Sequence, residues 1–130
     1  INEAKCYFVN ERHLEVIGLD DALSSKPVQP RAGTCGSELI VTRLVLQHSP
    51  GFFAEQTSEG LKADACLSGH THGGQVTLLG WAPITPPGSD PYVAGKYVTN
   101  ACPLYVSRGV GTSILPLRLG ARPEISFIDI

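Results

Sequence analysis

The stretch ADACLSGHTHGG, residues 63–74, carries two histidines, His70 and His72, onto a glycine-rich loop. Its apolar beginning predicts a short buried strand, so both imidazoles follow the downstream end of that strand. Gly73 and Gly74 come directly after them and tolerate backbone conformations and close ligand approaches that other residues do not. We therefore expect this loop to be a binding site.

A third histidine follows a predicted strand in the same way, because the run LVLQ at residues 44–47 leads directly into His48. Ligands of open α/β sheets bind at the downstream ends of strands, and neutral imidazole is the commonest side-chain ligand for Zn, Fe, Mn, Ni and Cu. A metal site at His48, His70 and His72 is the interpretation we favour over a glycine turn that merely contains histidines. The fourth histidine, His13, falls in a predicted hairpin and is expected to be structural.

The rest of the sequence predicts an α/β fold built on a strand-rich, mixed sheet with sparse helical cover. The run 38–47 is dense in β-branched residues and leucine, which is typical of a strand buried on both faces. Further strands are expected at 6–9, 13–19, 65–68, 75–79, 95–99, 103–107 and 124–130, one helix at 52–62, and loops at 20–37 and 80–91.

Two loops carry polar side chains of less specific meaning. Arg108 begins the stretch RGVG, in which an arginine and successive backbone amides suit an anion, although Gly-x-Gly loops are usually only turns. The pair Asp20-Asp21 follows a predicted strand and is expected to cap a turn.

Composition limits the class of protein. The chain has 130 residues, enough for the single domain, residues 1–130, that we expect, and 42% hydrophobic with 17% charged residues is typical of a globular protein. A net charge of −2 with singly spread Lys and Arg argues against a nucleic-acid partner and against a polybasic membrane patch. No apolar run approaches the roughly 18 residues of a transmembrane helix.

The sequence contains no methionine and begins with Ile1. We therefore expect the natural start to lie outside this chain, so that the chain is a fragment or has lost its first residues.

The four cysteines are isolated, with no CxxC pair. Two disulfides or a zinc site with histidine are alternatives, but Cys66 lies inside an apolar run, where free cysteine behaves as a small hydrophobe. We expect four reduced thiols and a cytoplasmic protein.

The motif HSP at 48–50, the loop GHTHGGQ at 69–75 and the tail LYVSRGVGTS at 104–113 together resemble the carboxyl-terminal half of a calcineurin-like metallophosphoesterase. The loop is most similar to the bacterial phosphodiesterase branch of that family. The resemblance implies half of a four-layer α/β/β/α sandwich, in which loops at the strand ends hold two divalent metal ions, whether Mn, Zn, Fe or Ni.

The resemblance also implies roles for individual residues. His48 and His70 would ligate one metal and His72 the other, and the two ions would activate a bridging hydroxide. Gly73, Gly74 and Arg108 would bind the phosphate of a phosphoester substrate. No catalytic residue is assigned, because the family's Asp-x-His, Gly-Asp-x-x-Asp and Gly-Asn-His-Asp/Glu motifs, which include its leaving-group acid, are absent from this sequence.

Two functions follow from this departure. The chain is expected to be part of a metal-dependent phosphodiesterase that is incomplete by itself; the alternative is a free-standing, non-catalytic half-domain that binds metal or a protein partner. A lone half would leave one sheet face uncovered, so we expect a homodimer or a complex with a missing amino-terminal half.

Overall fold

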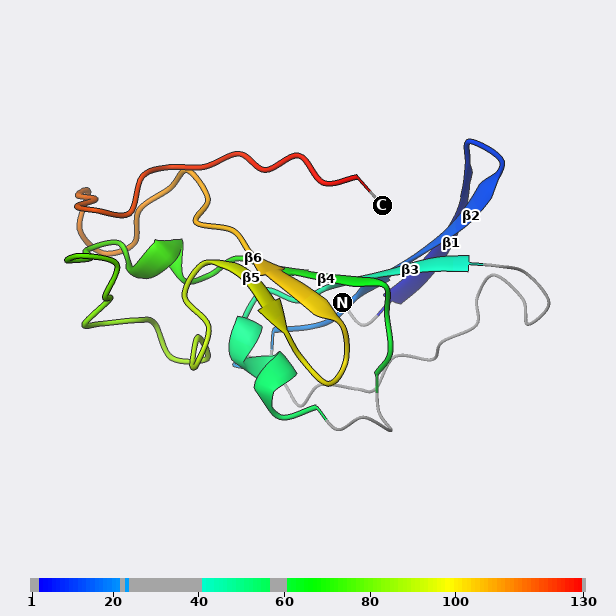
Figure 1. Ribbon diagram of the computed structural model, residues 1–130, viewed down its shortest axis with the longest axis horizontal. Helices are drawn as coiled ribbons and strands as arrows, with labels where there is room; N and C mark the ends of the chain where they lie inside the picture. The colour runs from blue at the N-terminus through cyan, green and yellow to red at the C-terminus, as the bar shows by residue number, and fades with distance from the viewer. Residues whose placement is uncertain (1–2, 22, 24–40, 57–60, 130) are drawn as a thin grey trace.

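The computed structural model describes residues 3–21, 23, 41–56 and 61–129. Six strands in this part of the chain form one sheet in the order β1-β2-β3-β4-β6-β5 (Figure 1). The elements in chain order are β1 (Glu3–Val9), β2 (Arg12–Gly18), β3 (Val41–Leu46), the 3-10 helix η1 (Pro50–Ala54), β4 (Ala65–Ser68), the 3-10 helix η2 (His72–Gly74), β5 (Gly95–Val98) and β6 (Pro103–Val106).

The sheet is parallel at its centre and antiparallel at both edges. Strands β2, β3, β4 and β6 run parallel, whereas β1 pairs with β2 and β5 with β6 as antiparallel neighbours. The four parallel strands therefore end at the same side of the sheet, which brings their following loops together. This confirms a strand-rich mixed sheet with few helices, consistent with an α/β fold.

The first hairpin turns at Asn10 and Glu11, whose φ angles are 48° and 63°. Two successive residues with positive φ between antiparallel strands form the turn that matches the right-handed twist of a hairpin. The predicted hairpin is confirmed, with β1 beginning three residues earlier than the expected Cys6.

The core lies on the central strands and under η1. Its fully buried side chains are Ile17, Val45, Phe53, Cys66 and Val106. Burial of β3 on both faces is wrong for the described part of the strand, because Leu46 is 39% exposed next to buried Val45. The predicted residues 38–40 lie outside the described part. One face of the sheet is thus packed and the other is open beside Leu46.

The helix predicted at 52–62 is wrong. A 3-10 helix, η1, ends at Ala54, and Leu61 and Lys62 are not helical. Glu55 and Gln56 are not helical either, and residues 57–60 lie outside the described part of the chain. Buried Phe53 anchors the short helix instead.

Two predicted strands are also wrong in the described residues. The stretch Gln75–Leu79 makes only isolated bridges, because its first and last residues have positive φ. Residues 124–129 form no strand of the sheet, and both sides of β6 are taken by β4 and β5. The predicted loop at 80–91 is confirmed; most of the loop predicted at 20–37 lies outside the described residues.

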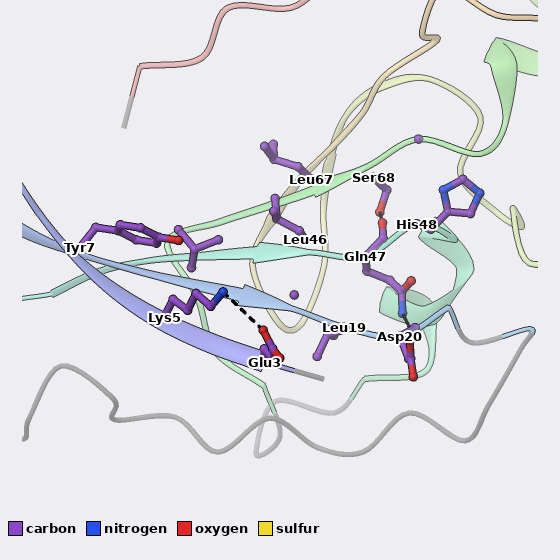
Figure 2. Close-up of a pocket in the computed structure, with 13 residues that line it drawn as sticks. Glu3, Lys5, Tyr7, Leu19, Asp20, Leu46, Gln47, His48, Leu67 and Ser68 are labelled. Carbon is purple, nitrogen blue, oxygen red and sulfur yellow. Dashed lines mark hydrogen bonds and ion pairs between the residues drawn. The ribbon is translucent and has the colours of Figure 1, made fainter. Parts of the chain in front are cut away.

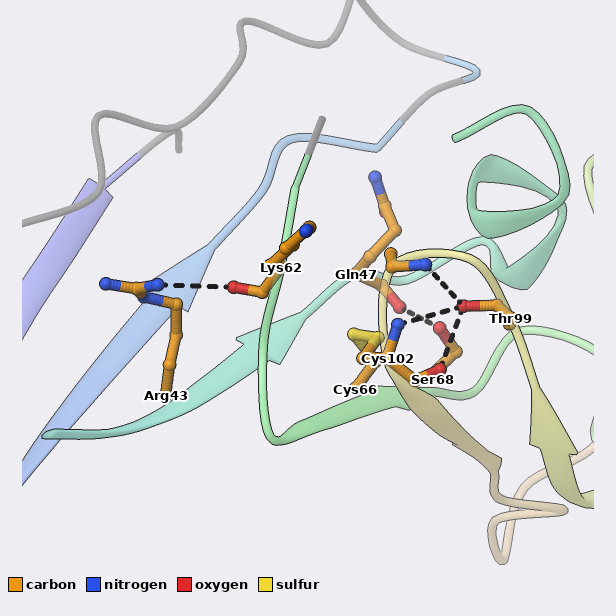
Figure 3. The surroundings of a disulfide bond; sticks show 8 residues. Arg43, Gln47, Lys62, Cys66, Ser68, Thr99 and Cys102 are labelled. Carbon is orange, nitrogen blue, oxygen red and sulfur yellow. Dashed lines mark hydrogen bonds between the residues drawn. A yellow bond between two sulfur atoms is a disulfide. The ribbon is translucent and has the colours of Figure 1, made fainter. Parts of the chain in front are cut away.

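The expectation of four reduced thiols is wrong. Cys66 in β4 and Cys102 before β6 form a disulfide, with their Cα atoms 5.9 Å apart (Figure 3), and Cys6 is disulfide-bonded as well. Thr99 holds the backbone at Cys102 in place, because its hydroxyl accepts hydrogen bonds from the amides of Ala101 and Cys102. The cytoplasmic setting therefore loses the argument on which it rested and stays a prediction.

No helix among the described residues is long and apolar enough to cross a membrane.

Candidate metal centre

The ends of the parallel strands are tied together by buried side chains. Gln47 follows β3 and donates from its side-chain amide to the Asp20 carbonyl after β2, at 2.8 Å. Ser68, the last residue of β4, donates to the Gln47 carbonyl at 2.6 Å, and the Gly69 amide donates to the His48 carbonyl at 3.3 Å. These bonds fix His48 and the histidine loop relative to each other.

His48 and His70 meet at this edge. Their nitrogens His48 Nε2 and His70 Nδ1 lie 3.0 Å apart, and the other ring nitrogen of His70 lies 2.8 Å from the Pro87 carbonyl. A carbonyl only accepts, so Nε2 of His70 carries a hydrogen and donates it. A neutral His70 then has its lone pair on Nδ1, where it accepts from the Nε2–H of His48.

This pair fits a metal ion. Two nitrogen ligands on adjacent positions of an ion, with bonds of about 2.1 Å, lie roughly 3.0–3.4 Å apart. The 3.0 Å separation of the two nitrogens falls within that range. The Pro87 carbonyl already provides the outer hydrogen bond that orients a metal-binding imidazole.

The pair alone supplies two ligands. Within residues 3–21, 23, 41–56 and 61–129, no three His, Cys, Asp or Glu side chains form a metal-holding group. The predicted third ligand, His72, is therefore not brought into one site with His48 and His70.

Asp21 places negative charge close to the histidine pair. Burial alone would raise the pKa of Asp21, but hydrogen bonds from the Ser49 hydroxyl and the Leu23 amide, together with nearby His48 and His70, hold this pKa below 3.8. The bond to the Leu23 amide is the turn-capping role predicted for this pair of aspartates. An anionic carboxylate near the two rings favours positive charge at the pair.

The histidine loop turns around Thr71. Its side chain is fully buried, donates to the Val93 carbonyl at 2.6 Å and accepts from the Gly73 amide at 3.1 Å. His70 and His72 on either side have φ of 68° and 51°, a region that histidine enters more readily than most residues. The positive φ expected of the glycines thus begins at the histidines themselves.

His72 is oriented by the carboxyl-terminal loop. Its Nδ1 lies 3.1 Å from the Gly111 carbonyl and 3.4 Å from Nη2 of Arg118. The contact to Gly111 is the shorter of the two, and a carbonyl only accepts, so we assign the hydrogen to Nδ1 of His72, which then donates to Gly111. That tautomer leaves Nε2 of His72 with a free lone pair, as a ligand needs.

The predicted phosphate-binding residues lie side by side. Gly73 and Gly74 have φ of 64° and 78°, and a Cβ at Gly73 would lie 2.8 Å from the side chain of Arg108. Nη1 of Arg108 donates to Glu124 at 2.5 Å, so its guanidinium is held beside the loop while 43% of the side chain stays exposed.

Three groups at the site were missed by sequence reasoning: the Pro87 carbonyl, Arg118 and Gln75. Gln75 donates to the carbonyls of Ser113 and Leu115 and so joins the histidine loop to the carboxyl-terminal loop. The sequence could have pointed to Arg118, because it is a charged residue that follows an apolar stretch. It could not have pointed to the Pro87 carbonyl, because every residue has a backbone carbonyl.

Comparison with known proteins finds relatives that are named metallophosphoesterase or phosphodiesterase. The chain is 37% identical over 118 residues to the uncharacterized metallophosphoesterase YkuE of Bacillus subtilis. The aligned region covers 90% of this chain and 40% of YkuE. It is 35% identical over 131 residues to the phosphodiesterase YaeI of Escherichia coli. This aligned region covers 99% of this chain and 46% of YaeI. The uncharacterized metallophosphoesterase YkoQ of Bacillus subtilis is 28% identical over 123 residues, 90% of this chain and 43% of its own length.

These relatives support the metallophosphoesterase family and a phosphoesterase type of function. The chain spans less than half the length of each of these three proteins. No family model matches the chain. No solved structure matches it either.

Proposed function

We propose that this chain forms part of a divalent-metal phosphodiesterase site within a four-layer α/β/β/α sandwich. The names of its relatives YkuE and YaeI imply a divalent metal cofactor and a phosphodiester substrate. The observation that carries the proposal is the 3.0 Å approach of His48 Nε2 to His70 Nδ1, with the Pro87 carbonyl behind His70.

His48 and His70 would hold one ion, and His72 would ligate a second through Nε2. Divalent ions at such a site polarise the phosphoryl oxygens and activate the attacking water. The chain itself contributes orientation, because the carbonyls of Pro87 and Gly111 fix which nitrogen of His70 and His72 faces a ligand.

Phosphate binding would fall to Gly73, Gly74 and Arg108. Glycine at both loop positions lets Arg108 and Ala82 pack closely on the loop. The amides of Gly73 and Gly74 already donate to Thr71, so an anion would have to compete for them. Glu124 neutralises part of the Arg108 charge but also restrains its direction, so a phosphate would compete for the remaining donors of the guanidinium.

Metal binding is tested by dialysing the protein against Mn²⁺ or Zn²⁺, removing free ion, and measuring bound metal by elemental analysis. We expect metal in the wild type and background metal in His70→Ala. The matched control is His13→Ala, because His13 contacts Phe8 in the hairpin and lies outside the proposed site. Equal metal in His70→Ala and wild type would contradict the proposal.

Activity is tested with bis-p-nitrophenyl phosphate. The sequence has no leaving-group acid of the family pattern, and general acid catalysis contributes about 10²–10⁴-fold to a rate. We therefore expect metal binding with barely measurable turnover for this chain alone. The second candidate function is a half-domain that binds metal or a partner without hydrolysis. Robust turnover that disappears in His72→Ala would exclude that candidate.

The open sheet face supports an association. A groove of about 700 Å³ runs over β1–β4, past Leu46 and Leu67, to His48 at one end (Figure 2). Lys5 and Glu3, both on β1, form an ion pair at 3.6 Å among its lining residues. We propose that a second copy of the chain or an amino-terminal half covers this face, since apolar strand residues are otherwise left in water.

Light scattering at micromolar concentration tests the association. We expect a mass of twice 13.8 kDa, or a complex with a co-expressed amino-terminal partner. Leu46→Lys should reduce the mass to that of one chain, whereas Leu79→Lys, a control far from the groove, should not. A stable wild-type monomer that does not bind the partner would contradict this proposal.

A further inference from the structure

Two loops beside the histidine site present large apolar side chains to water. Figure 1 shows them together at the end of the molecule opposite the β1–β2 hairpin, in green after η2 and in orange after β6. We call their exposed side chains the apolar rim: Leu78, Leu79, Trp81, Ile84, Ile114 and Leu115. Neither residues 76–89 nor residues 109–117 contain a charged side chain.

The two most exposed members stand at backbone positions that disfavour them. Leu79 and Ile114 are each 100% exposed, with φ of 51° and 64°. Left-handed φ strains a bulky residue, and a β-branched one most, so glycine or asparagine is expected at such places. Neither turn geometry nor burial among the described residues explains these side chains.

The turn that carries Leu79 makes the mismatch clear. Leu78 and Trp81 exchange two backbone hydrogen bonds of 2.9 Å around Leu79 and Gly80, both of positive φ. This two-residue turn strongly prefers Asn-Gly, yet the sequence has Leu-Gly.

The rim is held rigidly in place. Gln75 donates to the carbonyls of Ser113 and Leu115 at 2.9 and 3.0 Å and accepts from the Ser113 amide at 2.7 Å. The Thr77 amide donates to the Leu119 carbonyl at 2.7 Å. The two loops therefore present one prearranged surface instead of two independent tips.

We propose that the apolar rim is a membrane-docking surface that inserts into the interface of a lipid bilayer. Protruding tips suit a soft apolar phase, whereas a protein partner requires a complementary shape with a polar rim. Tryptophan is enriched at membrane interfaces, and the paired backbone around Leu79 avoids bringing open polar groups into lipid. Since the loops carry no charge, insertion and not attraction to anionic lipid would drive binding.

This inference does not depend on the proposed phosphoesterase activity. Docking would hold His72 near the bilayer surface, because Gly111 in the same loop bonds to it.

The test uses the single tryptophan of the sequence, Trp81, as its reporter. Phosphatidylcholine vesicles should shift Trp81 emission to the blue, brominated phosphatidylcholine should quench it, and 0.5 M salt, roughly a 4–5 Å screening length, should change little. The double variant Leu79→Asn/Ile114→Asn should partition at least about tenfold more weakly, because two apolar side chains no longer leave water.

The variants separate docking from misfolding and from general stickiness. Asparagine suits the left-handed backbone at both positions, so the double variant should melt no lower than wild type. The control Phe127→Asn removes a side chain that is 97% exposed outside the rim and should bind vesicles as wild type does. The proposal is overturned if the wild type does not bind vesicles, if the double variant binds them as tightly as wild type, or if Phe127→Asn loses as much binding as the double variant. It is also overturned if the blue shift depends on protein concentration without vesicles, which would mean self-association.

Discussion

The two sides of the candidate metal centre are built by different forces. His48 and His70 stand at the ends of β3 and β4, whose position is set by a parallel ladder and by burial of residues such as Val45. His72 instead belongs to a loop region, residues 72–82 and 108–121, where single side chains reach to backbone carbonyls.

The difference shows where the site is robust and where it is adjustable. Burial of apolar strands contributes several kcal/mol per large side chain, whereas each net hydrogen bond contributes about 1 kcal/mol. Substitutions in the strands should therefore unfold the protein, and substitutions in the loops should reorient His72 and leave the fold intact.

The same substitution in both regions tests this directly. Leu104 in β6 is 2% exposed and Leu119 in the loop region is 60% exposed. Leu104→Ala should lower the free energy of unfolding in urea by about 2–5 kcal/mol, because it leaves a cavity. Leu119→Ala should change it by less than about 0.5 kcal/mol. Equal losses would remove the distinction between the regions.

The disulfide gives the next largest effect on the strand side. Cys66 and Cys102 close a loop across 36 positions of sequence within the core. Replacing both by alanine should cost about 2–4 kcal/mol in the free energy of unfolding. Free-thiol titration of the unfolded wild type provides the control, since reactive thiols at these positions would show that the bond is not formed.

Arg118 sharpens the comparison from the loop side. It donates to the carbonyls of Gly111 and Arg108 at 2.7 Å each. Lysine in Arg118→Lys cannot make both hydrogen bonds, so the Gly111 carbonyl that fixes the His72 tautomer is no longer held in place. We expect metal affinity to fall about 10–100-fold, with little change in melting temperature. The ¹⁵N shifts of the His72 ring would report the tautomer. Exposed Arg122→Lys is the control, and an unchanged His72 spectrum in Arg118→Lys would contradict this role.

Glu124 should give the smallest effect, visible in the pH dependence of stability. Burial alone would raise the pKa of Glu124, but hydrogen bonds from Tyr105, the Arg108 amide and Ser126, with the Arg108 charge, hold it below 4.5. A carboxyl with a lowered folded pKa stabilises the fold above its unfolded pKa and loses that contribution as pH falls through the folded value.

The advantage of wild type over Glu124→Gln should therefore be full at pH 7 and shrink below about pH 4.5. Thermal melts at several pH values measure it. Glu3→Gln, at an exposed ion pair with Lys5, should show no such pH-dependent difference. If wild type and Glu124→Gln differ in melting temperature by the same amount at all pH values, another group controls the loss of stability in acid.

Strand prediction succeeded where apolar runs are long or end at clear turn residues. The strands ending at Leu46, Ser68 and Val106 were all found, because β-branched and leucine runs bury well in a parallel sheet. It failed at residues 75–79 and 124–129, which have strand-like composition but do not pair with a strand of the sheet. Pairing is a property of neighbours, so local pattern alone cannot decide it.

The sequence by itself determined that His48, His70 and His72 follow strand ends, because strand-forming composition and glycine turns are local properties. Only the tertiary structure decided that His48 and His70 meet at 3.0 Å while His72 turns to Gly111, and that Cys66 is bonded to Cys102. The physical reason is that these contacts join segments 22 to 39 residues apart, and their geometry depends on how the sheet aligns its strands.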